Sequence, residues 1–321
     1  MFTHILVPLD GSTLAECVVP HVMSLAIALD ARVTLLHVLE RPRDTAPFQP
    51  IDPLKWHLKK NEAGIYLDHI MAHFQQAGLN VDKTIQEGPA AECIISYANN
   101  NQVNLIVLST HGSSGMSMWN VSSVVQKIIL RANKSTLLVR AFEKVNKKPQ
   151  EIRYHRLFIG LDCSARAEMV LPVAIRLAGR YNASLIIGTV IQKPEIVNRL
   201  PVSEEDAGLV TRVAERNYKA AAHYLDQIHA QLAQTGLGIK TKLVVSDSQI
   251  AALHNMVEEE KADMVMLVAH GRSGEDRWSY GSVATSFIAY GSTSLLIVQD
   301  LSESELKISQ KEMTSVEIQG H

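Results

Sequence analysis

One pattern occurs twice in this chain, and that repetition constrains the fold more than any other feature of the sequence. The stretch "HILVPLDGSTLAE" that starts at His4 returns as "RLFIGLDCSARAE" at Arg156. Further along, "STHGSSG" at 109–115 returns as "VAHGRSG" at 268–274. Because self-similarity over such long stretches is typical of duplicated domains, we expect two copies of one structural unit.

Length and composition agree with two domains of ordinary size. The chain has 321 residues, of which 46% are hydrophobic and 20% charged, as in globular domains with sizeable cores. We predict one domain at 1–142, a polar and basic linker at 143–154, and a second domain at 155–300. The remaining segment, 301–321, has no apolar pattern and is predicted to be a loose tail.

Each unit alternates short apolar runs with helical segments. In the first unit, "HILVPL" and "RVTLLHVL" are typical of buried strands, and a long helix is expected at about 54–77. The second unit repeats the order, with its long helix at about 207–235. Strands connected in this way pair in parallel. We therefore predict an α/β fold with a five-stranded parallel sheet in each unit and helices on both faces.

Charge and cysteine content exclude several classes of function. The formal net charge is −2, which is not typical of a protein that binds nucleic acid or an anionic membrane. No apolar run is long enough to span a membrane. The three cysteines have no metal-like spacing and indicate free thiols in a reducing compartment. The first residues read directly as a strand with no basic leader, so we expect a cytoplasmic protein.

The candidate site lies where two kinds of segment follow strands. Asp10 and Asp162 follow the first strand of each unit, and the His-Gly loops at 109–115 and 268–274 follow the fourth. Ligands of open parallel sheets bind beyond the carboxyl ends of the strands. Each loop leads into a helix, whose free N–H groups and dipole favour an anion such as phosphate. The alternatives are that the glycines only shape a turn and that the aspartates only cap a helix or stabilise a turn.

The same residues resemble the universal stress protein family. The resemblance rests on strand-Asp-x-Ser-helix, "LLHV" on the second strand, "EGPAAECI", the His-Gly loop and a closing "LLVR", and it covers about 3–141 and 155–299. It implies tandem Rossmann-like domains of the adenine nucleotide alpha hydrolase-like type. The family's ATP-binding members have a Gly-x2-Gly-x9-Gly-[Ser/Thr] loop, with the first-strand aspartate and the end of strand two near the adenosine.

Carried over by residue, the resemblance favours the second unit as the nucleotide site. Ser109 and Ser122 stand at two of the three glycine positions in the first unit, whereas only Val268 departs from them in the second. If these positions required a positive φ, a side chain there would cost on the order of 1 kcal/mol. The candidates in the second unit are Asp162, Val190, His270, Gly271, Arg272, Gly281 and Ser282. The less complete set in the first unit is Asp10, Val38, Gly112, Ser122 and Ser123.

The resemblance implies a stress-response sensor or regulator that binds ATP or a related adenine nucleotide, with or without Mg²⁺. No residue stands out as catalytic, so we expect at most weak ATP hydrolysis. An alternative is an interaction module with decayed sites that binds partner proteins or another small molecule. The family's domains pair through their last strands, so 136–140 and 295–300 are expected to form an intramolecular pseudo-dimer. The sequence leaves a further homodimer open.

Other constellations have simpler interpretations. His69 and His73 have metal-compatible spacing, but no third ligand is evident, and we predict no metal site. A hydrolytic triad of Asp10, His111 and a nearby serine is disfavoured because no nucleophile elbow is present. We expect His111 and its counterpart His270 to hold their loops through hydrogen bonds to the backbone. Cys163 is interpreted as a small turn residue rather than a redox group.

Overall fold

The computed structural model describes residues 2–40, 52–112, 121–141, 152–193, 204–271 and 280–300. The first unit consists of β1 (His4–Pro8), η1 (Ala15–Cys17), α1 (Val18–Leu29), β2 (Arg32–Leu39), α2 (Pro53–Gln76), β3 (Val81–Glu87), α3 (Ala90–Asn100), β4 (Leu105–Ser109), α4 (Ser123–Ala132) and β5 (Ser135–Val139). The second consists of β6 (Arg156–Gly160), η2 (Ala167–Val170), α5 (Leu171–Tyr181), β7 (Ser184–Gln192), α6 (Glu204–Ala233), β8 (Ile239–Ser246), α7 (Gln249–Glu259), β9 (Met264–Val268), α8 (Ser282–Tyr290) and β10 (Ser294–Val298). The predicted alternation of strands and helices is therefore confirmed in both units.

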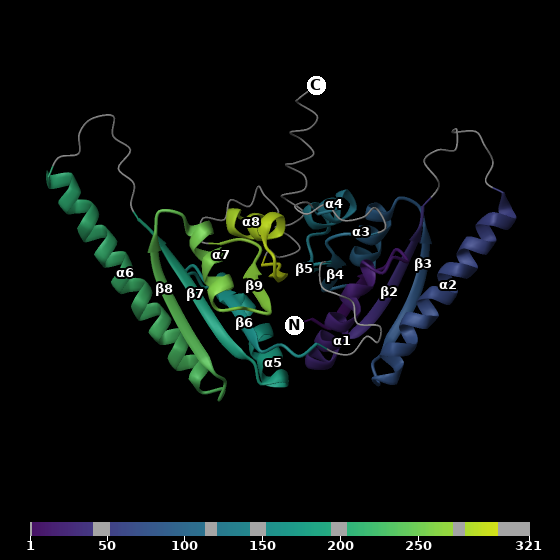
Figure 1. Ribbon diagram of the computed structural model, residues 1–321, viewed down its shortest axis with the longest axis horizontal. Coiled ribbons are helices and arrows are strands. Elements are labelled where there is room, and N and C mark those ends of the chain that lie inside the picture. Colours follow the sequence, from purple (N-terminus) through teal and green to yellow (C-terminus); the bar gives the residue numbers. More distant parts are fainter. Residues whose placement is uncertain are drawn as a thin grey trace, which may run out of the picture.

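The strands form one ten-stranded sheet in the order β3-β2-β1-β4-β5-β10-β9-β6-β7-β8. All pairs within each unit are parallel, as predicted. The two halves join through β5 and β10, which pair antiparallel with Leu295 opposite Leu138. The last strands of the units thus form the expected contact within one chain. In Figure 1, the long helices α2 and α6 lie along the two outer ends of this arrangement.

Helices cover both faces of the sheet because successive strand residues point to opposite sides. On one face, Ile5 packs with residues of α1, α2, α5 and α6. On the other, its neighbour Leu6 packs with residues of α3, α4, α7 and α8. Each face carries one apolar core that continues across both units. The sheet is therefore buried on both sides, and its strand ends remain as the places where polar groups gather.

The units also meet beside the sheet, where α1 packs against α5. Tyr154 is completely buried there, and its hydroxyl shares a hydrogen bond of 2.8 Å with Nδ1 of His21. The hydroxyl of Tyr181 donates to the carbonyl of Ser24 at 3.0 Å. The end of the segment predicted as a linker is therefore part of the core, although most of that segment lies outside the described residues.

Arg140 forms a second connection between the units. It follows β5, is 5% exposed, and donates hydrogen bonds to the carbonyls of Phe287 at 2.5 Å, Ile288 at 3.1 Å and Thr293 at 3.4 Å. Burial lowers the pKa of its guanidinium to about 10. A cation from the first unit thus lies at the C-terminal end of α8 in the second, where the helix dipole favours positive charge.

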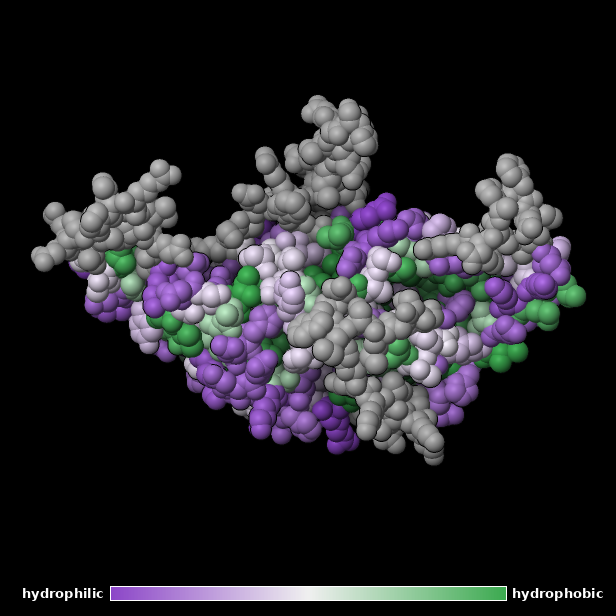
Figure 2. All heavy atoms as spheres, turned by 45° about the horizontal axis from the view of Figure 1, so that its top comes forward, coloured by the Kyte–Doolittle hydropathy of each residue, from purple (hydrophilic) through white to green (hydrophobic). Residues whose placement is uncertain are grey.

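Polar residues dominate the face in Figure 2, and apolar residues are interspersed among them. Within the described ranges, no helix combines the length and the hydrophobicity needed to cross a membrane.

Candidate functional site

The aspartate after the first strand of each unit has the same local structure. Oδ1 of Asp10 accepts hydrogen bonds from the backbone N–H and the hydroxyl of Ser12, at 2.9 and 2.6 Å. Oδ1 of Asp162 accepts the corresponding pair from Ser164, at 3.1 and 2.6 Å. The serine in turn accepts the N–H of Ala15 in the first unit, which starts a turn of 3-10 helix before α1. One carboxylate oxygen therefore shapes a turn, as the alternative interpretation held.

The second oxygen of each aspartate faces the glycine of the His-Gly loop. A Cβ atom added to Gly271 would lie 2.5 Å from Oδ2 of Asp162. A Cβ added to Gly112 would overlap with Oδ2 of Asp10. The structure thus brings together the two segments that the sequence placed at one edge of the sheet, in both units. The glycines are needed there for space, since among the described glycines a positive φ occurs at other positions only.

The starts of α4 and α8 have the same backbone but different capping. The N–H of Ser122 donates to the carbonyl of Thr110 at 3.0 Å, and that of Gly281 to the carbonyl of Ala269 at 2.8 Å. The φ angles are −59° at Ser122 and −68° at Gly281, so neither position requires glycine. The expected backbone strain of a serine here is therefore wrong, because both residues are in extended conformations that any residue adopts.

The difference between these two residues is chemical. The hydroxyl of Ser122 accepts the N–H of Val125 at 3.4 Å and so occupies one of the free donors of α4. Gly281 provides no side-chain cap to α8. Helix starts without a cap keep their N–H groups for water or a ligand. Ser123 and Ser282 are the first helical residues after these positions. The second unit thus presents more backbone donors at the predicted phosphate position than the first.

Both loop histidines are buried, and Nδ1 of each ring lies next to a side-chain oxygen. His111 Nδ1 lies 3.1 Å from the hydroxyl of Thr110. His270 is 1% exposed, and its Nδ1 lies 2.9 Å from Oδ1 of Asp300. These Nδ1 contacts are made to side chains, whereas the sequence predicts hydrogen bonds to the backbone. Each ring is held in place by a side chain. The partner is Thr110 next to His111, and Asp300 after β10 for His270.

The second strand of each unit pairs with the strand that leads to the aspartate, β2 with β1 and β7 with β6. Val190 is buried and Val38 is partly buried, both against the same apolar face of the sheet. On the other side, burial of Tyr66 of α2, followed by the nearby charges of Glu16 and Asp10, raises the pKa of its hydroxyl.

The second unit repeats this arrangement with Tyr224. Burial, followed by the charges of Glu168 and Asp162, raises the pKa of its hydroxyl. The sequence carried a signal for these residues, because each tyrosine lies on the long helix and each glutamate lies in the repeated Asp-x-Ser segment.

Some predicted residues lie apart from this arrangement. Arg272 is outside the described residues. The rings of His69 and His73 contact each other edge to face at 5.1 Å between centroids. No group of three or more His, Cys, Asp or Glu suited to a metal ion occurs in the described part of the chain. Cys163 has a φ of 64°, and its counterpart Gly11 has a φ of 83°, so a tight turn is formed at both positions.

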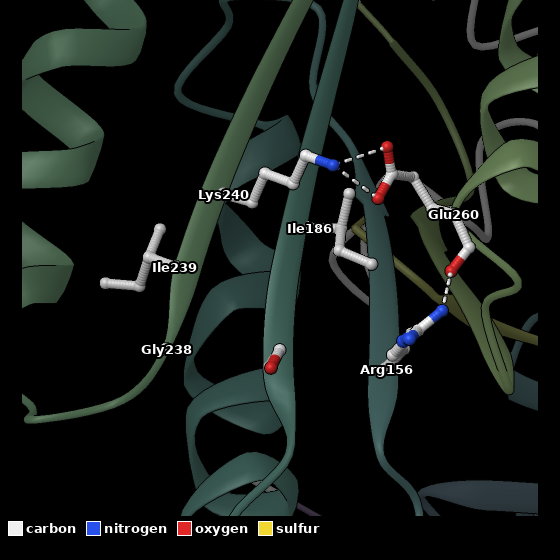
Figure 3. Close-up of a pocket in the computed structure, with 7 residues that line it drawn as sticks. Arg156, Ile186, Gly238, Ile239, Lys240 and Glu260 are labelled. Carbon is white, nitrogen blue, oxygen red and sulfur yellow. Dashed lines mark hydrogen bonds and ion pairs between the residues drawn. The ribbon is translucent and has the colours of Figure 1, made fainter.

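A pocket of about 500 Å³ lies at the opposite edge of the second unit, at the starts of β6, β7 and β8. It is lined by Arg156, Ser184, Ile186, Gly238, Ile239, Lys240 and Glu260. Figure 3 shows Lys240 and Arg156 both directed to Glu260, with 2.8 Å from the ammonium to each carboxylate oxygen and 3.0 Å from the guanidinium to the backbone carbonyl. These cations are engaged within the pocket, which is separated from Asp162 by the length of the strands.

Known proteins resemble the chain as two repeats. The model of the universal stress protein family matches residues 1–140 and 153–299. Universal stress protein MJ0531 of Methanocaldococcus jannaschii is 26% identical over 149 residues, 45% of this chain and 85% of that protein. YxiE of Bacillus subtilis is 26% identical over 149 residues, 44% of this chain and all of that protein, 100%. The crystal structure of a universal stress protein from Archaeoglobus fulgidus has a TM-score of 0.63 at 15% identity, covering 93% of this chain and 98% of that one.

Proposed function

Because this chain belongs to the universal stress protein family, we propose that its second unit binds ATP or a related adenine nucleotide. The protein then acts as a cytoplasmic sensor or regulator in a stress response, with weak hydrolysis at most. The single observation that carries the proposal is the start of α8, where Gly281 leaves the helix without a side-chain cap. Its N–H groups and dipole suit a phosphate, and Asp162 stands on the other side of Gly271.

The residues divide the nucleotide between two sides of the strand ends. Gly271, Gly281 and Ser282 provide backbone at the phosphate side. Asp162 and Val190 lie toward the adenosine side, where a carboxylate suits ribose hydroxyls and an apolar side chain suits a base. His270 holds the loop in place, because its ring is buried and forms a hydrogen bond with Asp300. Mg²⁺ would accompany the phosphates of the nucleotide, since such ions are bound largely through phosphate oxygens and water.

The first unit supports a second candidate function. Ser122 already occupies the N–H of Val125 with its own hydroxyl, which weakens that helix start as an anion site. Asp10 and Gly112 keep the same contact as in the second unit. We infer that the first unit acts as a structural and interaction module, paired with the nucleotide-binding unit through β5 and β10.

An exchange of the two helix-start residues tests the proposal. Gly281→Ser copies the first unit, and a Cβ there makes only ordinary contacts, 3.6 Å from the nearest atom, so the fold should persist. We expect it to weaken ATP binding by about five-fold, which corresponds to the roughly 1 kcal/mol of one capping interaction. Ser122→Gly is the matched control and should leave the measured affinity unchanged.

Isothermal titration with ATP and ADP, each with and without Mg²⁺, provides the measurement. If the wild-type chain binds no nucleotide at concentrations of about 1 mM, the proposal is wrong. If Asp10→Ala removes binding while Gly281→Ser has no effect, the nucleotide is bound by the first unit instead.

A further inference from the structure

The second unit contains a buried network of charged side chains at its candidate site. Asp300 follows β10, and its side chain has no exposed surface. Its Oδ1 lies 2.9 Å from Nδ1 of His270 and accepts the backbone N–H of the same residue at 3.2 Å. Its Oδ2 forms an ion pair with Nε of Arg166 at 3.0 Å. One carboxylate therefore joins three segments that are far apart in the sequence.

These segments include both parts of the proposed nucleotide site. Arg166 belongs to the turn that starts with Asp162, and His270 immediately precedes Gly271. The contact between the Asp162 carboxylate and Gly271 thus lies between two segments that Asp300 holds together. A buried carboxylate with charged and hydrogen-bonded partners has one arrangement of low energy, because any displacement leaves a charge without its partner.

The first unit has the same backbone without this network. Leu14 occupies the position of Arg166, and Ala141 occupies the position of Asp300. There the hydroxyl of Thr110 lies 3.1 Å from His111 Nδ1 and accepts the N–H of Ala141 at 3.3 Å. Neutral residues are therefore sufficient for the fold of this edge. The charged network must serve something that only the second unit has.

We propose that Asp300 is a positioning residue for nucleotide binding in the second unit, acting through Arg166 and His270. It fixes the turn of Asp162 against the loop of Gly271 before the ligand arrives. This inference rests on the function proposed above and explains how one unit keeps a preorganised site while the other does not. Preorganisation raises affinity because less conformational entropy is lost when the ligand binds.

The test compares affinity with stability in one set of variants. Asp300→Ala removes the buried carboxylate together with its ion pair to Arg166, so both the unfolding midpoint and the affinity for ATP should fall. Asp300→Ala combined with Arg166→Leu reproduces the residues of the first unit, and its midpoint should return toward that of the wild type. Its affinity should stay about ten-fold below the wild type, a typical coupling of neighbouring residues.

All titrations use ATP with Mg²⁺ and chains that also carry Asp10→Ala, so that the measured heat comes from the second unit. Asp300→Asn keeps the shape of the side chain and should give an intermediate affinity. Tyr154→Phe is the matched control, because it removes a buried hydrogen bond of 2.8 Å between the units and should lower the midpoint without changing affinity.

Two results separate this inference from the proposed function. An affinity that recovers together with the midpoint in the double variant, or that never falls, overturns the positioning role and leaves nucleotide binding intact. If the chain with Asp10→Ala alone does not bind ATP, nucleotide binding by the second unit is refuted, and the inference with it. If Asp300→Ala does not fold, Asp300→Asn and Arg166→Leu carry the same comparison.

Discussion

The segments that end at Gly112 and Gly271 have the same backbone contacts but different side-chain chemistry. In both, the glycine lies against an aspartate carboxylate and the following helix start bonds back to the strand end. They differ in the residue at the helix start and in the group that holds the histidine, a hydroxyl in one unit and a carboxylate in the other. A duplicated fold can therefore keep its geometry while the groups offered to a ligand change.

The largest effect on stability is expected at the junction between the units, to which only the first unit contributes a buried arginine. Arg140 donates to three carbonyls around the end of α8, whereas Gln299 stands at its position in the second unit. Arg140→Gln should reduce the free energy of unfolding by about 3 kcal/mol, since hydrogen bonds from a charged group are lost in a buried place. Chemical denaturation monitored by circular dichroism measures this change.

Arg131→Gln serves as the control for that variant. Arg131 is exposed, and its ion pair with Glu92 at 3.6 Å should contribute little. Equal losses in the two variants would show that the buried contact across the units has no special weight.

The next largest effect is expected from alanine at the two loop glycines, which should change ATP affinity in one unit only. A Cβ at Gly271 forces Asp162 to turn away and lose its bonds to Ser164, at a cost of about 2 kcal/mol in the free energy of unfolding. Gly112→Ala should cost a similar amount. Only Gly271→Ala should also weaken ATP binding in isothermal titration. If both variants, or neither, change the affinity, the proposed division between the units is wrong.

The smallest effect concerns the acid response of the first unit. Burial lowers the pKa of His37, more than a bond to the Leu9 carbonyl and the charge of Asp10 raise it. The folded state therefore resists protonation, and its stability should decrease as the pH falls below the ordinary histidine value of about 6.5. Thr189 stands at this position in the second unit. His37→Thr should lose less stability on acidification than the wild type.

Thermal unfolding of both proteins at about pH 7.5 and about pH 5.5 measures that difference. Other histidines with lowered pKa values, His4 and His254, are present in both chains and cancel in the comparison. If the wild type and His37→Thr have the same pH dependence of stability, His37 does not contribute to the acid response.

The sequence was sufficient to predict the parts of the site that follow from sheet topology. Repetition and strand periodicity placed Asp10 and Gly112 at one sheet edge, because parallel strands end on the same side. The pairing of β5 with β10 was expected only from the resemblance to the universal stress protein family. The structure confirms both predictions.

Other features could not be predicted because they depend on single contacts between distant residues. The space required by an aspartate at Gly271 depends on how two loops approach each other, and no periodicity reports this distance. The sequence places Tyr154 in a polar linker. Its burial could not be predicted, because the residues that surround it come from α1 and α5. Asp300 and Arg166 are ordinary surface residue types, and only the fold brings them together.

The continuous sheet through β5 and β10 has a consequence for how the molecule can change. In an assembly of two identical chains, every substitution appears on both sides of the axis, and dilution separates the halves. Here both strands belong to one polypeptide, so the seam forms at a very high effective concentration and survives dilution. Each copy of the site can then be altered alone, which allows one chain to combine a ligand-responsive half with a half that serves another purpose.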